Sequence, residues 1–460
     1  MQLLEPMHIE SLNSPAAGSE MYELISELFP ICRSNTGEGV RETLRILQQR
    51  IPLAIHEVLS GTRVFDWEVP QEWNIHDAYI KDASGKRIVD FRQSNLHVVN
   101  GSMPIQARLT WSELKPHLTT LPEHLDWIPY RTCFFEKRWG FCLSHARFLE
   151  LEQQGEAEYE VCIDSRLEDG SLTYGELLLR GEVDEEVLIS THVCHPSLAN
   201  DNLSGIAVAT QLACHLEKLD RRLSYRFLFI PATIGAVTWL CLNESELGNI
   251  KHGMILSVVG DSGASTYRRT RHGDAEIDRA VEHVLKHSDD KSTLLDFEPF
   301  GYDQRQFCSP GINLPVGCLM RTPDQQYPEY HTSADNLDFV RPECLADSWA
   351  KCVRVTDVLE HNRTYLNCKP KCEPRLGPSG LYHAFDGVAD WAALQRATLW
   401  VLNLSDGEHS LLEIAERSEL SFSFIKQGAA LLKEHGFLTE LKADAANCPL
   451  PATSELSATC

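Results

Sequence analysis

The chain lacks features that mark membrane and nucleic-acid-binding proteins. It contains no run of about 18 uncharged apolar residues, the length that a membrane-spanning helix needs. Basic residues are scarce, with 42 Lys and Arg against 66 Asp and Glu and a net charge of −24. So acidic a chain repels nucleic-acid phosphates and anionic membrane surfaces. We therefore expect neither nucleic acid nor a membrane as a partner.

Secretory and thiolate-metal signals are missing as well. No basic segment followed by an apolar stretch opens the sequence, and no Cys-x-x-Cys pair occurs among its 15 cysteines. An odd cysteine count without a secretory signal argues against a disulfide framework. The nearest approach to a structural zinc site, Cys368 and Cys372, has no second pair nearby. We expect a cytoplasmic protein with reduced, mostly buried cysteines.

The apolar pattern indicates an α/β core. Apolar residues at helical spacing predict two helices between residues 19 and 59. Short continuous apolar runs then alternate with helical stretches, and such runs are typical of buried strands in a largely parallel sheet flanked by helices. The runs lie at 177–179, 186–190, 225–230 and 254–259, and the helical stretches include 207–219 and 277–287.

The remaining segments predict two further parts. We expect residues 19–66 and 163–368 to form the α/β core, and the β-rich residues 67–162 to form a small insert in it. After a Pro-rich linker, residues 379–445 show a helix, a turn, a second helix, then a Gly and an apolar step, which is typical of a winged helix-turn-helix. The tail at 446–460 is expected to be disordered.

The winged-helix segment is too acidic to favour DNA as its ligand. Residues 385–445 carry ten acidic and five basic side chains, whereas a DNA-reading helix needs basic ones. We expect the segment to pack within a homo-oligomer or to bind a protein partner.

The chemistry is concentrated between residues 190 and 205, directly after an expected strand. His192, His195 and Asp201 lie within ten residues there, and imidazole and carboxylate are ligands that suit Zn²⁺. Loops at the carboxyl ends of parallel strands are also where α/β sheets place their sites. The alternative is that Asp201 or Asn202 only caps the helix that follows.

Two later segments offer further ligands. Asp261 ends another apolar run, and His331 is followed four residues later by Asp335. A catalytic zinc takes about three protein ligands and a water, with outer carboxylates orienting the imidazoles. Asp335 is a candidate to orient His331. Alternatively, Asp261 is a turn residue and His331 a buried structural histidine.

The order of these motifs resembles the zinc aminopeptidase and glutaminyl cyclase superfamily. The matching pieces are His192-Val-Cys194, Asp201-Asn-Leu-Ser-Gly205, Asp261 and His331-Thr-Ser-Ala-Asp335. About residues 20–445 are similar, more closely, to bacterial aminopeptidase-like proteins with an inserted β domain and a C-terminal winged helix. The closer match lies in residues 73–80, 139–143, 195–201 and 302–311.

The resemblance implies one zinc ion, with a second possible. His192 and Asp261 would bind the first metal, Asp201 would bridge, and His331 would bind the second. This sequence departs from the pattern at Cys194, where the peptidases have an Asp, and His195 is a possible substitute ligand.

A second departure removes the general base. The peptidases have a Glu-Glu pair after the next strand, whereas this chain has Ala232 in the segment 229–235. Loss of a base costs on the order of 10²–10⁴-fold in rate. Asp303, Asp324 and Glu329 are candidate replacements, and the alternative is that they belong to an acidic surface loop.

Other residues are candidates to bind substrate. The insert is expected to act as a lid, from which Tyr130 and Arg131 would contact a ring or a carboxylate. Tyr302 and Arg305 precede His331 and invite the same interpretation. The alternative is that the arginines lie on the surface and the aromatic rings in the core.

The favoured function is hydrolysis by a zinc-dependent, aminopeptidase-like enzyme. Its substrate would be a small peptide or aminoacyl amide, within polysaccharide or specialised-metabolite biosynthesis as the resemblance implies. The alternatives are a catalytically weakened metal-binding or scaffolding protein on the same fold, and a single-zinc acyl transferase or cyclase.

Overall fold

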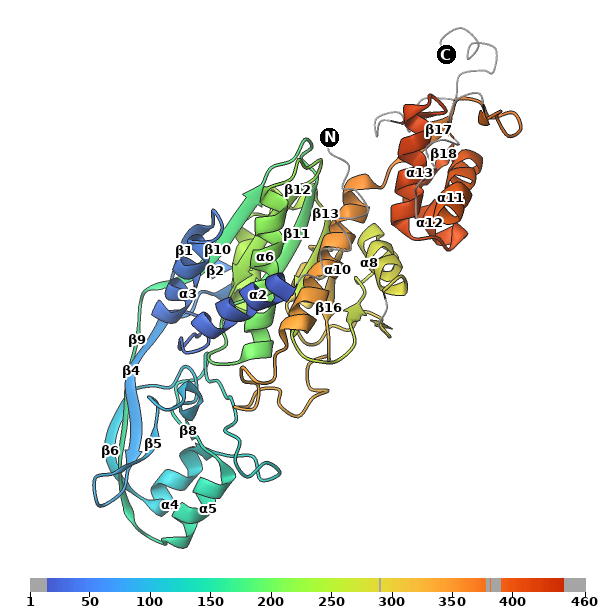
Figure 1. The fold of residues 1–460 in the computed structure, drawn as a ribbon. Helices are drawn as coiled ribbons and strands as arrows, with labels where there is room; N and C mark the ends of the chain where they lie inside the picture. The colour runs from blue at the N-terminus through green and yellow to red at the C-terminus, as the bar shows by residue number, and fades with distance from the viewer. Residues whose placement is uncertain (1–14, 289–290, 378–380, 382–389, 442–460) are drawn as a thin grey trace. The chain divides into compact units, whose positions relative to one another are not determined.

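The computed structural model describes residues 15–288, 291–377, 381 and 390–441. The chain divides into two compact units (Figure 1), which we treat separately. The first comprises mainly residues 7–278 and 290–352, and the second mainly residues 279–289 and 353–460. The tail expected at 446–460 lies outside the described residues.

The first unit contains a mixed, largely parallel sheet of eight strands. The central strands β12, β11, β13 and β16 run parallel to one another, whereas β10 and β14 join them antiparallel. The spatial order is β1 (Ala54–Leu59), β10 (Ser171–Leu179), β12 (Ser224–Ile230), β11 (Glu186–His192), β13 (Ile250–Leu256), β16 (Val316–Met320), β14 (Thr266–Arg268) and β15 (Thr293–Leu295). The expected α/β fold class is confirmed.

Helices cover both faces of this sheet because its central strands are apolar on both sides. Leu188, Leu228 and Ile230 pack into one core cluster with α7 (Ile234–Leu242) and α9 (Gln304–Phe307). The alternate residues Val187 and Ile189 are also buried, since successive side chains of a strand point to opposite faces. Helices α2 (Pro15–Leu28), α6 (Gly205–Glu217) and α10 (Pro342–His361) lie in front of the sheet in Figure 1.

The segment expected to hold two helices contains a strand as well. Helix α3 (Glu38–Gln48) ends well before residue 59, and Ala54–Leu59 form β1 at the edge of the sheet. Our prediction therefore extended the helical segment too far along the chain. The β-branched Ile55 and Val58 favour a strand and pair with β10 instead.

The β-rich insert has its own sheet and its own core. Strands β5 (Arg87–Asp90), β4 (Glu72–Lys81), β9 (Glu158–Glu168) and β6 (Ile105–Thr110) pair in that order. Helices α4 (Trp111–Leu114) and α5 (His145–Gln153) contribute Trp111, Leu114 and Leu151 to this core. The sheet reaches Glu168, beyond the boundary expected at residue 162. Short strands β2 (Arg63–Val64) and β3 (Trp67–Glu68) form a hairpin before the insert, and β7 (Leu118–Thr119) pairs with β8 (Phe141–Cys142) within it.

The second unit contains the helix-turn-helix. It includes α8 (Glu276–Lys286) for most of its length, α11 (Trp391–Leu404), α12 (Leu411–Ser418) and α13 (Phe422–Glu434). Its sheet has the order β18 (Asp406–Ser410), β17 (Thr364–Asn367) and β19 (Leu438–Glu440). Ser410 and Glu413 form a capping box that fixes the start of α12. Strand β17 lies before residue 379, the expected start of this part.

A buried ion pair stabilises the second unit. Lys426 Nζ on α13 contacts both carboxylate oxygens of Asp357 at 2.7 Å, and both side chains are 8% exposed. Removing Lys426 leaves the buried carboxylate of Asp357 with His361 Nδ1, 3.1 Å away, and without its cation. Lys426→Met is expected to cost roughly 3–5 kcal/mol of unfolding free energy, measured by hydrogen exchange at α13 amides. Lys433→Met, which breaks a half-exposed pair with Glu440, is the control, with an expected cost below about 1 kcal/mol. Equal effects would contradict the prediction.

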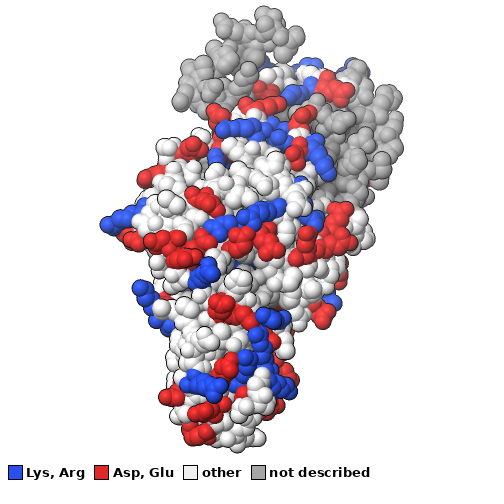
Figure 2. All heavy atoms as spheres, turned by 90° about the vertical axis from the view of Figure 1, so that its left-hand side faces the viewer, with Lys and Arg blue, Asp and Glu red and all other residues white. Residues whose placement is uncertain are grey.

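The charged side chains are mixed on the surface. On the face drawn in Figure 2, basic and acidic groups are interspersed, and neither sign covers a large continuous area. None of the helices within the described residues has the length and apolar character that crossing a lipid bilayer requires.

Candidate metal site

Three segments meet at the carboxyl end of the parallel strands. Strand β11 ends at His192, which is in register with Ile230 at the end of β12. The loop that follows carries His195 and Asp201 and leads into α6. His331 arrives from the loop before α10. The sheet thus gathers residues that are up to 139 positions apart, since 331 − 192 = 139.

The carboxylate of Asp201 lies between two imidazoles. Its Oδ1 is 3.0 Å from His192 Nε2, and its Oδ2 is 2.9 Å from His331 Nε2. The side chain of Asp201 is completely buried. His195 is the third imidazole, with a ring centroid 4.7 Å from that of His192 and 5.2 Å from that of His331.

The imidazole nitrogens and the carboxylate of this group are in the forms that bind a metal ion. One ligand atom each of His192, His195 and Asp201 lie within 4.8 Å of one another. Burial lowers the pKa of His195 to about 3, so its ring is neutral and can donate a lone pair. Although burial opposes ionisation of Asp201, the three imidazoles hold its pKa well below the usual range. Neutral imidazole and carboxylate are the forms that bind Zn²⁺, and the donors therefore fit this ion.

Neighbouring groups hold the loop in place. Asp335 accepts hydrogen bonds from the backbone N–H groups of Asn200 at 2.6 Å and Asp201 at 2.9 Å. It therefore orients the Asp201 backbone, and no hydrogen bond between the described side chains of Asp335 and His331 is found. Cys194 lies beside His195, with Sγ 3.9 Å from Nδ1. Burial raises the pKa of its thiol to about 12, so Cys194 is neutral where the peptidases carry an Asp.

Asp261 accepts hydrogen bonds through both of its carboxylate oxygens. Its Oδ1 accepts from Thr322 Oγ1 and the Gly263 N–H, and its Oδ2 accepts from Asn200 Nδ2 and the Thr322 N–H. Four hydrogen bonds occupy both oxygens, so the carboxylate ties the loop of Asn200 to the end of β13. The ligand role expected for Asp261 stays a prediction.

Asn202 joins the strand ends beneath the site. Its Nδ2 donates to Thr191 Oγ1 at 2.8 Å and to the Leu256 carbonyl at 3.2 Å, and its Oδ1 accepts from the Val258 N–H at 3.1 Å. Neither Asn202 nor Asp201 caps α6, which begins after Ser204 without a side-chain cap. The capping alternative therefore does not describe this loop.

Loss of the Asn202 amide is expected to destabilise the first unit. Asn202→Ala leaves the buried Val258 N–H and Leu256 carbonyl without this partner, which should cost about 2–4 kcal/mol. Urea unfolding measures the change. Asn243→Ala removes one hydrogen bond to Trp239 at the end of α7 and is the control, with an expected cost of about 1 kcal/mol. A loss no greater than that of the control would contradict the prediction.

The segment that lacks the Glu pair lies next to the donor loop. Val193 donates its N–H to the Ile230 carbonyl at 3.0 Å, which brings residues 231–233 alongside Cys194. Thr233 Oγ1 accepts from Arg305 Nη2 at 3.4 Å. A guanidinium thus lies near the position where the resemblance leads one to expect carboxylates.

Asp303 carries an available carboxylate close to His192. It precedes α9, yet its side chain makes no capping hydrogen bond, and its buried Oδ1 has no partner among the described residues. Burial raises its pKa to about 6, partly offset by His192 and Arg305. A buried carboxyl group with a pKa near neutrality has the properties of a general base.

The other two candidate bases differ from Asp303. Asp324 is buried and lies 3.8 Å from Arg268 Nη2, and burial raises its pKa. Glu329 is half-buried, and its main-chain carbonyl accepts hydrogen bonds from Thr332.

The insert reaches the site through a short strip, Ile128–Tyr130. Ile128 exchanges hydrogen bonds with Ser333, and the Tyr130 N–H donates to the His331 carbonyl at 2.7 Å. The Tyr130 ring is edge-on to the rings of His195 and His331, and its centroid lies 5.1 Å from the centroid of each. Arg131 is exposed and donates to the Tyr130 carbonyl.

Aromatic rings line the other sides of the donor group. Tyr302 stacks on His192 with 5.6 Å between ring centroids, and Tyr330 stacks on His331 with 4.0 Å between ring centroids. Sequence reasoning missed Tyr330 and the buried Arg33 and Asn100 behind Tyr130. The adjacency of Tyr330 to the His331 motif was the only signal for any of the three.

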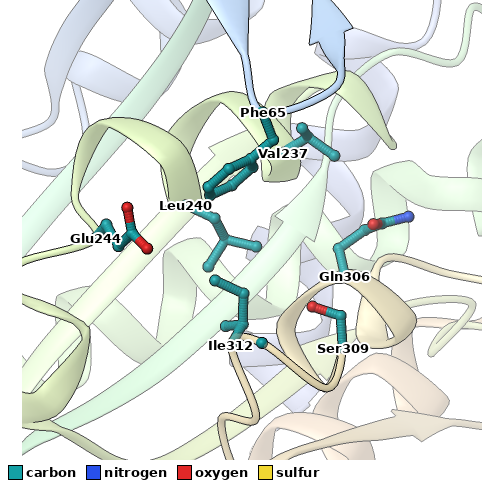
Figure 3. A pocket seen from close by; sticks show the side chains of 8 residues that line it. Phe65, Val237, Leu240, Glu244, Gln306, Ser309 and Ile312 are labelled. Carbon is teal, nitrogen blue, oxygen red and sulfur yellow. The ribbon is translucent and has the colours of Figure 1, made fainter.

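A separate hollow of about 240 Å³ lies between α7 and the segment after α9 (Figure 3). Its walls are Phe65, Val237, Leu240, Glu244, Gln306, Ser309, Gly311 and Ile312. None of the metal donors lines it, so we do not assign the reaction to this hollow.

Comparison with known proteins covers most of the chain. Residues 22–362 match the family described as "Domain of unknown function (DUF4910)", and residues 363–440 match a winged helix-turn-helix family. A Clostridium acetobutylicum relative, provisionally named a polysaccharide biosynthesis protein with an aminopeptidase-like domain, is 53% identical over 420 residues, covering 91% of this chain and 96% of the relative.

Solved structures agree with this placement. The crystal structure of a protein from Clostridium acetobutylicum, provisionally described as a peptidase, has a TM-score of 0.89 at 50% identity and covers 95% of this chain and 99% of that one. A zinc aminopeptidase from Bacillus subtilis has a TM-score of 0.54 at 14% identity, covering 74% of this chain and 94% of that one, which shows the shared fold alone. The chain therefore belongs to the DUF4910 family, as an aminopeptidase-like α/β protein with a C-terminal winged helix-turn-helix.

Proposed function

We propose that this protein is a zinc-dependent hydrolase that cleaves an amide bond next to a free amino terminus in a small substrate. The observation that carries the proposal is the buried carboxylate of Asp201 between His192 and His331, with His195 beside it. The polysaccharide biosynthesis named for the relative supports a biosynthetic role.

The donors in this proposal are His192, Asp201, His195 and His331. These four residues would hold one zinc ion and could provide ligands for a second. Bound zinc would supply a Lewis acid that lowers the pKa of water and polarises the substrate carbonyl. We leave Asp261 out of the donor set because hydrogen bonds occupy both of its oxygens.

The protein's own residues would handle protons and orientation. Asp303 accepts a proton from the attacking water and returns it to the leaving amine, because its Oδ1 is buried near His192 without a partner. Asp324 and Glu329 are weaker candidates for this step. Tyr130 and Tyr302 enclose the substrate, and Arg305 contacts it from the side of Thr233. For Arg131, exposure favours a role outside the site.

We further propose that the winged-helix unit binds a protein partner or a second copy of the chain. The acidic excess of residues 385–445 supports this over DNA binding.

Metal content and hydrolysis on the same samples test the main proposal. Elemental analysis of the full chain is expected to give one to two zinc ions per chain, with hydrolysis of aminoacyl amides in a substrate screen. Zinc without turnover would favour the metal-binding or scaffolding alternative. Absence of bound metal after incubation with zinc would overturn the hydrolase.

A further inference from the structure

Arg33 is a buried cation without a carboxylate partner. Its side chain is 0% exposed, and it forms no ion pair with any described residue. The other buried cations in the described parts of the chain each pair with an Asp or Glu. They are Arg226, Arg268, Arg321, Lys351 and Lys426. Burying a charge is costly unless it is paired, so the position of Arg33 calls for a counter-charge.

Part of the guanidinium holds the donor loop. Arg33 Nε donates to the His195 carbonyl at 2.8 Å, and Nη1 donates to the Leu28 carbonyl at 2.7 Å. Arg33 Nη2 is buried and has no partner among the described residues. Main-chain carbonyls satisfy hydrogen bonds but carry no net charge, so they leave the positive charge of Arg33 unbalanced.

A second buried donor lies on the same side of His195. The hydroxyl of Tyr130, which is 2% exposed, has no partner among the described residues, and its ring contacts His195 at 5.1 Å. Arg33 and Tyr130 thus both lie against His195, Arg33 through its hydrogen bond to the His195 carbonyl and Tyr130 through its ring.

We infer that Arg33 and Tyr130 form an anion subsite beside the metal donors, and that it binds a carboxylate of the substrate. Two unpartnered donors match the two oxygens of one carboxylate, and one guanidinium balances a single negative charge. A phosphate dianion would remain half-balanced. The inference rests on the proposed function for its substrate and specifies it as a small amide with a free carboxylate.

Access to the subsite depends on the strip Ile128–Tyr130. Arg33 is completely buried, and in our inference a ligand reaches it when the strip moves off Ser333 and His331. Three hydrogen bonds between backbone or serine groups hold the strip there, and contacts of this kind exchange readily with water.

Matched ligands test the subsite. Calorimetric titration of zinc-loaded full chain with leucyl-glycine and leucyl-glycinamide compares a carboxylate with an amide of the same shape, and hydrolysis of both is followed separately. Wild type is expected to bind the acid roughly 10–100-fold more tightly than the amide. Arg33→Met abolishes this preference and Arg33→Lys retains part of it, whereas Arg45→Met, on the exposed face of α3, leaves it unchanged.

Each outcome decides one question. Equal affinity for the acid and the amide in wild type overturns the subsite, even if hydrolysis occurs. If the carboxylate preference depends on Arg33 but neither ligand is hydrolysed, the result supports the subsite and contradicts the proposed hydrolase function. If Arg33→Met does not fold, Tyr130→Phe decides: a preference reduced several-fold supports the subsite, and an unchanged preference overturns it.

Discussion

Replacing His192 with alanine is expected to remove the bound zinc and all measurable aminoacyl-amide hydrolysis. His192 provides one of the two imidazoles in contact with Asp201 and comes from the end of β11, a strand whose residues are all buried. Without it, Asp201 retains His331 and His195 but loses the ligand that the sheet fixes most firmly. Elemental analysis should fall from at least one zinc ion per chain to nearly none, and kcat/KM by more than about 10³-fold.

Asp261→Asn is the matched comparison. Asparagine keeps the side-chain shape and an acceptor oxygen for Thr322 Oγ1 and the Gly263 N–H, but its NH2 group replaces Oδ2, the acceptor of Asn200 Nδ2 and of the Thr322 N–H, so part of the tie to the Asn200 loop is lost. If Asp261 only ties this loop down, zinc content stays near the wild-type value and stability falls modestly. If zinc is lost in Asp261→Asn as completely as in His192→Ala, Asp261 is a ligand after all, and our donor set is wrong.

The fold could be predicted from local patterns because its central strands are buried on both faces. The runs that became β11, β12 and β13 are continuous and apolar, and their positions agree with the sequence prediction. The edge strand β1 was missed because Ala54–Leu59 is half exposed and carries no such run. A half-exposed edge strand forms because it pairs with a neighbouring strand, here β10. The spacing of residues within the segment carries no information on that pairing.

The donor residues could be predicted from their chemistry and motif order, including His331, which is far from the others in sequence but whose Nε2 lies 2.9 Å from Asp201 Oδ2. His192, His195 and Asp201 share one loop, and structure brings their ligand atoms within 4.8 Å. Asp261 has the same residue type and a similar place after a strand, yet its oxygens are taken by Asn200, Thr322 and Gly263. Which carboxylate is free depends on hydrogen bonds between distant segments, and composition does not encode these.

The burial of Arg33 could likewise not be predicted from the local sequence. Its sequence neighbours Ser34, Asn35 and Thr36 are polar, which is typical of an exposed loop. All four residues are nevertheless buried, because the loop lies beneath the insert, where Asn100 donates to the Arg33 carbonyl at 2.8 Å. Burial of a polar loop by a segment some 70 positions away is a tertiary property.

Asp303→Asn is expected to lower kcat by roughly 10²–10⁴-fold while zinc remains bound. Asparagine has nearly the same volume but cannot accept the proton of the attacking water. Asp303 lies outside the donor group, so elemental analysis should match wild type. A variant that keeps zinc and kcat would show that another group, such as Asp324 or Glu329, serves as the base.

The pH dependence of the wild type provides an independent test of Asp303. The base acts in its ionised form, and burial raises its pKa to about 6, so kcat should rise as the pH increases through about 6 and then level off.

The raised pKa of Asp303 also affects the stability of the fold. Because the folded state holds the Asp303 proton more tightly than the unfolded chain, ionisation costs folding free energy as the pH rises from about 4 to 6, by roughly 3 kcal/mol. Asp303→Asn removes this cost, so at pH 7 it should unfold no more easily than wild type. Lost turnover in a protein of equal or greater stability would then arise from the missing base and not from a damaged fold.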